Sequence, residues 1–302
     1  MIRRFLVLTI AALLAATWAL SEPAIETLPY QADQSWPQLP EHWNLRETAA
    51  VAADAKDHVY VFHRGLHPII EFDPAGKFVR SFGEGLFDSP HGLRIDPEGN
   101  IWAVDNAAHV VVKMDPKGRV RMVLGRRGTS GETEDLFFRP TDVTFAPNGD
   151  FFVSDGYGNS RVVKFAKNGK FIKAWGKRGV KDSEFNTPHS VVVDKSGRLL
   201  VADRENFRIQ IFDQDGKFLQ KWGHVGSPWG LALHGDNTLF MSDGYNNRIL
   251  KLDLDGRIVG SFGSHGKLPG ELELPHQMTV DSRGAVYVGE ITNWRAQKFV
   301  AK

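Results

Sequence analysis

The feature that most constrains this chain is a sequence unit of about forty residues that recurs along it. In residues 188–223 (PHSVVVDKSGRLLVADRENFRIQIFDQDGKFLQKWG), four short runs rich in β-branched and aromatic residues alternate with turn sequences containing Asp, Asn and Gly. This pattern is typical of short strands joined by tight turns. A single four-stranded sheet cannot bury both of its faces, so such a unit is expected to recur and to pack against its own copies.

Six copies align on an opening Pro, in most of them, and on a closing aromatic–Gly pair. They cover residues 48–83, 90–125, 140–176, 188–223, 228–263 and 275–302. Four strands per copy at this period predict an all-β fold, a six-bladed β-propeller. The last copy stops after its third strand, so an N-terminal strand should complete that blade and close the ring. Residues 36–45 are the expected candidate, and closure would leave no exposed sheet edge.

The N-terminal residues have the pattern of a targeting segment. Arg3 and Arg4 precede a mostly apolar run over residues 5–20, which ends in a small-residue cleavage pattern. This run is short for a membrane span, so we interpret residues 1–21 as a signal peptide rather than an uncleaved anchor. The protein is then expected to be exported to the periplasm or the extracellular space. Residues 22–40, with several prolines, are expected to form a linker, and residues 41–302 the propeller.

Composition excludes several classes of function. The net charge is +1 with both signs interspersed, which gives no support for a nucleic-acid partner. The chain has no cysteine, so thiolate metal sites, Cys nucleophiles and disulfides are excluded. We expect a monomer that acts on a small molecule or a peptide.

Features that most copies share are expected to serve the fold. An Asp or Glu ends the second strand of each copy from the second onward, and in the last four an Arg follows five or six residues later. We interpret these as turn-stabilising pairs within a blade. The closing Trp-Gly or Phe-Gly is interpreted as packing between blades.

One position varies regularly along the repeat. The residue after the opening position is His in alternate copies; in order the six residues are Ala49, His91, Thr141, His189, Trp229 and His276. Alternate blades of such a ring lie a third of a turn apart and their first strands are innermost, so the three histidines should point at one spot on the axis. Three neutral imidazoles with an open fourth position predict a catalytic zinc site, or one for a similar divalent ion. A lone histidine here would more often be a packing or surface residue. Among the other histidines, His63 and His67 are candidates for supporting this site.

Loops that join second and third strands should lie on the same face as the histidines. Three of them carry residues that could act on a substrate, namely Arg64, Tyr157 and Arg204. The two arginines have no counterpart in the other copies and could clamp a substrate carboxylate, although a solvated rim charge is the plainer interpretation. Tyr157 has a near-duplicate in Tyr245, and spacing alone does not distinguish them.

These residues resemble a known family. The copies are similar to NHL repeats, which alone are unspecific, but several stretches resemble the peptidyl-α-hydroxyglycine α-amidating lyases, six-bladed zinc propellers that perform the second step of peptide C-terminal amidation. The stretches are FHRG (62–65), PHGLRID (90–96), RPTDV (139–143), SDGYGNSR (154–161), PHSV (188–191), ADRENFRIQ (202–210) and LPHQ (274–277).

The resemblance implies roles for particular residues. The histidines of the three Pro-His pairs would bind Zn²⁺, the tyrosine of GYxNSR would be the base, and the arginines of HRG and ADREN would engage the substrate. In this sequence these are His91, His189 and His276, then Tyr157, then Arg64 and Arg204. Where the family usually has an Asp tied to a structural Ca²⁺, this chain has Gln277, and the family's disulfides are absent, so the case for calcium is weak.

Three functions remain open from the sequence. The first is a lyase that cleaves the C–N bond of a peptidyl- or N-acyl-α-hydroxyglycine to a primary amide and glyoxylate, with a separate monooxygenase as partner. The second is a metal-dependent, lactonase-type hydrolase, which three histidine ligands disfavour because such propellers rely mainly on carboxylate and amide ligands. The third is an exported NHL binding scaffold whose metal is structural.

Overall fold

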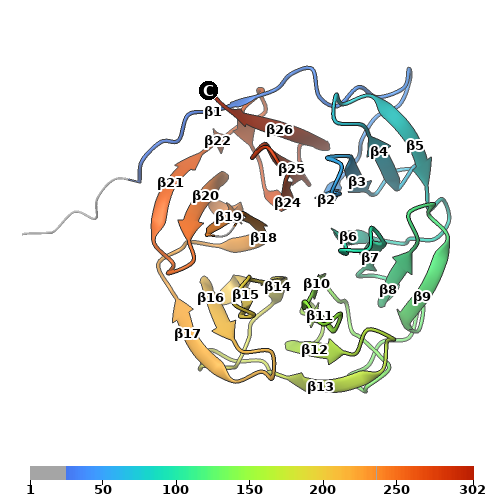
Figure 1. The fold of residues 1–302 in the computed structure, drawn as a ribbon, viewed down its shortest axis with the longest axis vertical. Helices are drawn as coiled ribbons and strands as arrows, with labels where there is room; N and C mark the ends of the chain where they lie inside the picture. The colour runs from blue at the N-terminus through green and yellow to red at the C-terminus, as the bar shows by residue number, and fades with distance from the viewer. Residues whose placement is uncertain (1–24, 236) are drawn as a thin grey trace, which may run out of the picture.

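The computed structural model describes residues 25–235 and 237–302, so the expected signal peptide lies outside the described residues. Six four-stranded antiparallel sheets stand around a central axis as the blades of a ring (Figure 1). Five blades are built from four strands that follow one another in sequence, with the first strand innermost, and the sixth combines strands from both ends of the described chain. The expected all-β, six-bladed propeller is confirmed.

The first five blades each consist of four consecutive strands. The first blade contains β2 (Thr48–Ala53), β3 (Val59–His63), β4 (Ile69–Phe72) and β5 (Phe78–Phe82), and the second contains β6 (Pro90–Ile95), β7 (Ile101–Asp105), β8 (Val110–Met114) and β9 (Val120–Gly125). The third blade contains β10 (Asp142–Phe145), β11 (Phe151–Asp155), β12 (Arg161–Phe165) and β13 (Phe171–Trp175), and the fourth contains β14 (Pro188–Val193), β15 (Leu199–Asp203), β16 (Arg208–Phe212) and β17 (Phe218–Trp222). The fifth blade contains β18 (Pro228–His234), β19 (Thr238–Asp243), β20 (Arg248–Asp253) and β21 (Ile258–Phe262). Two short 3-10 helices, Arg204–Asn206 and Gly244–Asn246, lie in the β15–β16 and β19–β20 loops.

The sixth blade joins the two ends of the described chain. It contains β24 (Pro275–Val280), β25 (Val286–Glu290), β26 (Arg295–Ala301) and, as its outer strand, β1 (Tyr30–Ala32). Figure 1 shows β1 beside β26 at the point where the ring closes. The small parallel pair β22 (Ser264–His265) and β23 (Glu271–Leu272) lies between the fifth and sixth blades in sequence.

The closing strand was expected at residues 36–45, and that expectation is wrong. β1 pairs with β26 in the register Tyr30 to Ala301, inside the segment expected to be a linker. The apolar residues that suggested a strand have another role: Trp36 and Leu45 are buried in the cluster between the sixth and first blades. Burial between blades, rather than strand pairing, therefore explains why residues 36–45 look hydrophobic.

The turns between strands follow from an Asp-x-x-Gly pattern. In the β14–β15 turn, Asp194 Oδ1 accepts hydrogen bonds from the backbone of Ser196 and Arg198, both at 2.9 Å. Gly197 donates to the Asp194 carbonyl at 2.9 Å and has a φ of 78°, a conformation that glycine adopts without a steric penalty. This local chemistry fixes the register between β14 and β15.

Hydrophobic side chains pack between neighbouring blades. Six buried clusters occur in the described residues, and each combines side chains from two successive blades, including the sixth with the first. Trp222 and Phe262, from closing aromatic–Gly pairs, belong to two of these clusters, which confirms their packing role. The ring is therefore held by blade-to-blade contact, and no single blade has a core of its own.

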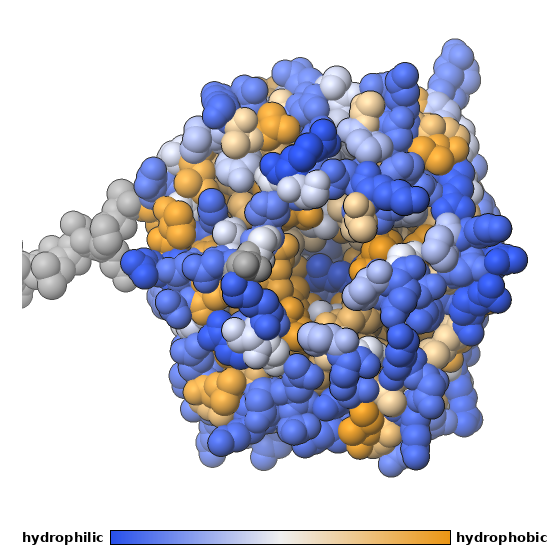
Figure 2. All heavy atoms as spheres, in the orientation of Figure 1, coloured by the Kyte–Doolittle hydropathy of each residue, from blue (hydrophilic) through white to orange (hydrophobic). Residues whose placement is uncertain are grey.

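The shared acid–Arg pairs are structural, as expected. Arg161 lies 3.0 Å from Asp155, Arg208 2.7 Å from Asp203, and Arg295 2.7 Å from Glu290, all within a blade. In the part of the chain that the structure describes, no helix is long and apolar enough to cross a membrane. The space-filling view shows a face hollowed at its centre, with hydrophilic atoms at the floor of the hollow (Figure 2).

Candidate metal centre

The three repeat-position histidines meet at the axis. His91, His189 and His276 are the second residues of β6, β14 and β24, and their side chains are fully or almost fully buried. Their ring centroids form a nearly equilateral triangle with sides of 4.6, 4.8 and 4.8 Å. One nitrogen of each ring lies within 4.8 Å of the other two. The alternation in the repeat thus becomes a threefold cluster of imidazoles.

Each histidine is oriented by the blade that follows it. His91 Nδ1 lies 2.7 Å from the carbonyl oxygen of Thr141, and the corresponding distances are 2.7 Å for His189 to Trp229 and 2.5 Å for His276 to Ala49. A carbonyl oxygen can only accept, so Nδ1 carries the proton in all three rings and Nε2 keeps its lone pair. The same repeat position therefore has two uses: alternate copies provide a candidate metal ligand, and the copies between them provide the carbonyl that orients it.

The histidines are held in the neutral form. Burial is the largest cause of their low pKa values, which lie well below 6.5 for His91 and His189 and at about 3 for His276. The positive charges of Arg64 and Arg204 act in the same direction. Three neutral imidazoles, each fixed by a carbonyl acceptor on its other nitrogen, are a donor set that suits zinc or a similar divalent ion.

Tyr157 brings a hydroxyl into contact with this cluster. Its Oη lies 3.1 Å from His91 Nε2 and 3.0 Å from His189 Nε2. Arg204 Nη1 donates to the same oxygen at 3.1 Å. A phenol oxygen beside both the candidate ligand atoms and a fixed guanidinium can exchange a proton with anything bound at the histidines.

The near-duplicate Tyr245 has a different environment. Its side chain is 47% exposed, and its hydroxyl donates to Glu205 at 3.1 Å. Partial burial raises its pKa, which disfavours the phenolate. Equivalent positions in the repeat therefore do not give the two tyrosines equivalent access to the axis.

Loop conformation explains the difference between the tyrosines. In the third blade the loop lies against the preceding segment: the backbone NH of Gly158 donates to the Phe138 carbonyl at 2.9 Å, and a Cβ at Gly158 would lie 2.2 Å from the Phe138 ring. In the fifth blade the same loop forms the 3-10 helix Gly244–Asn246, with Asn247 at a φ of 54°. Glycine at position 158 thus permits the close approach that brings Tyr157 to the histidines.

The two predicted arginines lie on the same face as Tyr157. Arg204 is only 8% exposed; it lies 2.8 Å from Glu205, and its Cζ is 4.4 Å from the centroid of the Trp229 ring. It is therefore not the solvated rim charge that was the plainer interpretation. Arg64 is less buried, and its Nε lies 3.4 Å from the carbonyl of Pro90, the residue before His91.

Other predicted and unpredicted residues complete this region. His63 is buried, which lowers its pKa to about 4, and its Nδ1 accepts from the backbone of Arg46; His67 stacks on Trp43. Both therefore make their contacts away from the three central histidines. Arg139, with Cζ 5.3 Å from the centroid of the Tyr157 ring, was not assigned a role from the sequence, although it lies in the RPTDV stretch.

The residues in the channel do not fit a calcium ion. Ca²⁺ takes six to eight oxygen ligands, usually with several carboxylates. Gln277 is buried, and its amide lies 3.4 Å from both Ser190 Oγ and the His189 carbonyl. The carboxylate nearest to it in this network, Asp142, is already paired with the guanidinium of Arg94 at 2.6 Å.

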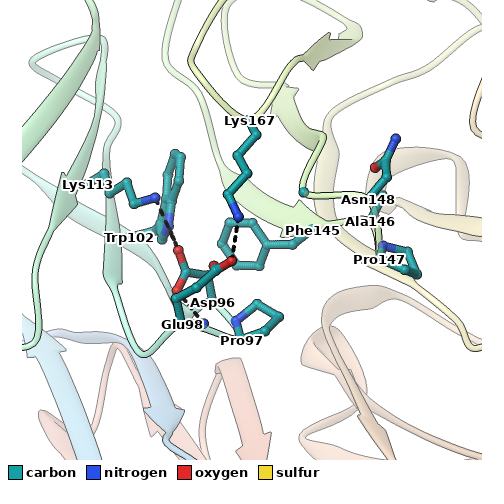
Figure 3. A pocket seen from close by; sticks show the side chains of 11 residues that line it. Asp96, Pro97, Glu98, Trp102, Lys113, Phe145, Ala146, Pro147, Asn148 and Lys167 are labelled. Carbon is teal, nitrogen blue, oxygen red and sulfur yellow. Dashed lines mark hydrogen bonds and ion pairs between the residues drawn. The ribbon is translucent and has the colours of Figure 1, made fainter.

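A separate cavity of about 110 Å³ lies on the opposite face, between the second and third blades (Figure 3). Asp96, in the turn after β6, and Glu98 line it, and they pair with Lys113 at 3.4 Å and Lys167 at 2.7 Å. Trp102 also donates to Asp96, at 2.9 Å. Its charged groups are satisfied internally, so we assign this cavity to blade packing.

The chain is similar to proteins of known families. The NHL repeat family matches residues 137–165 and 185–212. The chain is 32% identical over 298 residues to peptidyl-glycine alpha-amidating monooxygenase of Mus musculus, covering 84% of this chain and 30% of that protein. It is 32% identical to NHL repeat-containing protein 3 of Homo sapiens, covering 91% of this chain and 85% of that protein. It is 28% identical to peptidyl-alpha-hydroxyglycine alpha-amidating lyase 1 of Drosophila melanogaster, covering 90% and 60%.

The chain matches only part of its larger relatives, and the solved structures that it resembles are distant in sequence. The chain spans about a third of the length of the vertebrate amidating monooxygenases that it matches. Among solved structures, a streptogramin B lyase has a TM-score of 0.67 at 14% identity, covering 90% of this chain and 98% of that one. A putative gluconolactonase has a TM-score of 0.65 at 14% identity, covering 91% and 93%. At this identity the structural likeness shows the propeller fold alone.

Proposed function

Since this chain belongs to the NHL-repeat propeller family that includes the peptidyl-α-hydroxyglycine α-amidating lyases, we propose that it is a zinc-dependent lyase. Its substrate would be a peptidyl- or N-acyl-α-hydroxyglycine, which it cleaves to a primary amide and glyoxylate. The observation that carries the proposal is the contact of the Tyr157 hydroxyl with the Nε2 atoms of two of three buried, neutral histidines. A scaffold would not need a proton-transferring group at that point.

The reaction requires the substrate hydroxyl to lose a proton and the amide nitrogen to gain one. In the substrate, one carbon carries a hydroxyl, a carboxylate and the amide nitrogen. Loss of the hydroxyl proton lets the oxygen form a carbonyl while the C–N bond breaks, and the nitrogen gains a proton to become the primary amide. Zinc held by His91, His189 and His276 would supply Lewis acidity that makes a bound hydroxyl easier to deprotonate.

Tyr157 is the proton acceptor in this proposal. Its oxygen lies within hydrogen-bond distance of the Nε2 atoms that face the axis, so it also reaches a group bound there. Arg204 donates to this oxygen at 3.1 Å and so fixes the position of the phenol beside the histidines.

Arg64 and Arg204 are proposed to hold the substrate carboxylate. A guanidinium can bind a carboxylate through two parallel hydrogen bonds, which fixes both its position and its orientation. Arg204 is stacked over Trp229 and tied to Glu205, so it is already ordered before substrate arrives. Such preorganisation lowers the entropic cost of aligning the reacting bond.

The cellular setting is also a proposal. We infer that residues 1–21 direct export and that the mature protein acts in the periplasm or outside the cell as a monomer. Its substrate would be supplied by a separate monooxygenase that hydroxylates the α-carbon of a C-terminal glycine. The product would be a peptide or an acyl group that ends in a primary amide.

Glyoxylate release from a synthetic N-acyl-α-hydroxyglycine tests the proposal. We expect activity in zinc-loaded protein, little in chelated protein, and recovery when zinc is restored. His189→Ala should lose metal and activity while its circular dichroism spectrum stays close to that of the wild type. His265→Ala, at an exposed histidine in β22, is the matched control and should keep both. Hydrolysis of a lactone without glyoxylate release, or metal binding without either activity, would refute the lyase proposal.

A further inference from the structure

Arg94 extends across the central channel just below the three histidines. It lies on β6, three residues after His91, and its side chain is 16% exposed. The guanidinium contacts Asp142 through two atoms, with Nε at 3.0 Å and Nη2 at 2.6 Å. Nη2 also lies 3.1 Å from Ser190 Oγ and 3.0 Å from the Leu231 carbonyl. One side chain thus links the innermost strands of four successive blades.

Asp142 is the anion of this network. Its side chain is 1% exposed, and besides Arg94 it accepts from Ser190 Oγ at 2.7 Å and from the backbone of Val143 and Val191 at 2.9 and 3.2 Å. Gly92 makes room for this arrangement, because a Cβ there would lie 2.5 Å from the Thr141 carbonyl and 3.3 Å from Asp142 Oδ1. Without a cation, the carboxylate would be a buried and unpaired charge.

The network adjoins the metal centre through the backbone. Ser190 follows His189, and Gln277 follows His276. Asp142 follows Thr141, whose carbonyl fixes the ring of His91. The Gln277 amide in turn lies 3.4 Å from the His189 carbonyl. His189 and His276 are therefore each joined by one peptide bond to a residue of the Arg94 network. His91 is linked to it by one hydrogen bond, to Thr141, and the peptide bond that follows Thr141.

We propose that Arg94 is the permanent cation of the channel, so that the protein needs no second metal ion beneath the histidines. A divalent ion at this point would organise carboxylate, hydroxyl and carbonyl oxygens from several blades, and the guanidinium contacts one group of each kind. Arg94 is a positioning residue, since it acts on the histidines through their neighbours. The inference does not depend on the substrate or on the reaction proposed above.

Calcium binding to the unaltered protein is the first test. Zinc-loaded protein would be titrated with CaCl₂ by calorimetry, and its melting temperature would be measured with and without added calcium. We expect no saturable calcium site and no change in melting temperature. A stoichiometric calcium site accompanied by a rise in melting temperature would overturn the proposal.

Replacement of Arg94 is the second test, with zinc affinity measured by competition with a chromogenic chelator. Arg94→Met keeps an unbranched side chain, though a shorter one, and removes the charge, and we expect the melting temperature to fall by about 5–10 °C. Zinc affinity should fall by about ten-fold to a hundred-fold, as when an outer partner of metal ligands is lost. Unchanged zinc affinity in a folded Arg94→Met protein would show that Arg94 does not position the histidines.

Two further variants separate charge from general damage. Arg119→Met removes an arginine whose side chain is 63% exposed and paired with Asp115 in the same blade, so zinc affinity and melting temperature should stay close to those of the wild type. Arg94→Lys retains the charge but not the two-pronged contact, and it should keep more zinc affinity and a higher melting temperature than Arg94→Met. Equal losses in Arg94→Lys and Arg94→Met would contradict the role of the charge. If Arg94→Met does not fold, the lysine variant and the calcium titration still decide the question.

Discussion

At the scale of single residues, the position of one phenol distinguishes this site from a simple cluster of histidines. Tyr157 Oη contacts His91, His189 and Arg204, which come from three loops or strands of two other blades. Tyr245 occupies the equivalent loop two blades further on, but its hydroxyl is bound to Glu205. The two tyrosines therefore offer an internal comparison within one protein.

Tyr157→Phe should lower kcat by about two to four orders of magnitude, because it removes the proton acceptor and keeps the ring. Zinc content, measured by elemental analysis, should change little. Tyr245→Phe is the matched control and should have a much smaller effect on glyoxylate release. Equal modest effects would mean that neither hydroxyl accepts the proton, and a larger effect from Tyr245→Phe would transfer the role to that residue.

The sequence was informative at this scale wherever a residue broke the repeat. The three histidines could be predicted because they alternate along six aligned positions. Arg94 gives the same kind of signal, because it is the one charged residue at its repeat position. The equivalent residues in the other five copies are Ala52, Thr144, Val192, Ala232 and Thr279. The roles of Tyr157 and Tyr245 could not be separated by the repeat, because the Tyr157 loop is one residue longer and contains Gly158, and both differences change how it packs.

At the scale of elements, the N-terminal segment acts as a tie between the first and last blades. β1 pairs with β26, and Trp36 packs against Phe72 of the first blade and Tyr287 of the sixth, with ring centroids 5.8 and 5.0 Å apart. The sequence predicted the need for this tie but not its register. The three-residue strand Tyr30–Ala32 is too short to show a recognisable hydrophobic periodicity. Residues 36–45 resemble a strand only because some of their hydrophobic side chains, such as Trp36, are buried between blades.

Trp36→Ala should destabilise the ring by about 3–5 kcal/mol, since it leaves a cavity where a large side chain fills the junction of two blades. Denaturant unfolding of metal-free protein would measure the loss. Trp294→Ala, at a tryptophan that is 47% exposed, is the control and should cost much less. A loss at Trp36 no larger than that at Trp294 would mean that the N-terminal segment adds little to closure.

At the scale of the whole molecule, buried neutral histidines make stability depend on pH. In the unfolded chain these histidines have a pKa near 6.5, whereas burial lowers the pKa of His63 to about 4 and that of His276 to about 3, and lowers those of His91 and His189 as well. Below pH 6.5 the unfolded chain therefore binds more protons than the folded protein. The stability contributed by these residues is complete above that pH and declines as the pH falls toward 4.

The melting temperature of metal-free protein should accordingly be nearly constant above pH 7 and fall between pH 6.5 and 4. Zinc-loaded protein should keep its metal through most of this range and release it on unfolding, because low pKa values keep the folded imidazoles neutral and available to the metal. Scanning calorimetry and a zinc-sensitive dye measure the two effects. A melting temperature that stays level down to pH 4 would contradict the burial of neutral histidines.

The alternation of ligand and carbonyl around the axis has a consequence for how the protein matures. Each of the three central histidine rings is oriented by the blade after it, and for His276 that blade is the first, 227 residues earlier in the chain. A nascent chain that lacks its final blade has only two of the three imidazoles, and a complete chain whose ends have not met leaves His276 without its orienting carbonyl. We therefore expect that a metal ion would bind fully only after the ring has closed, so that metal content would report completed assembly.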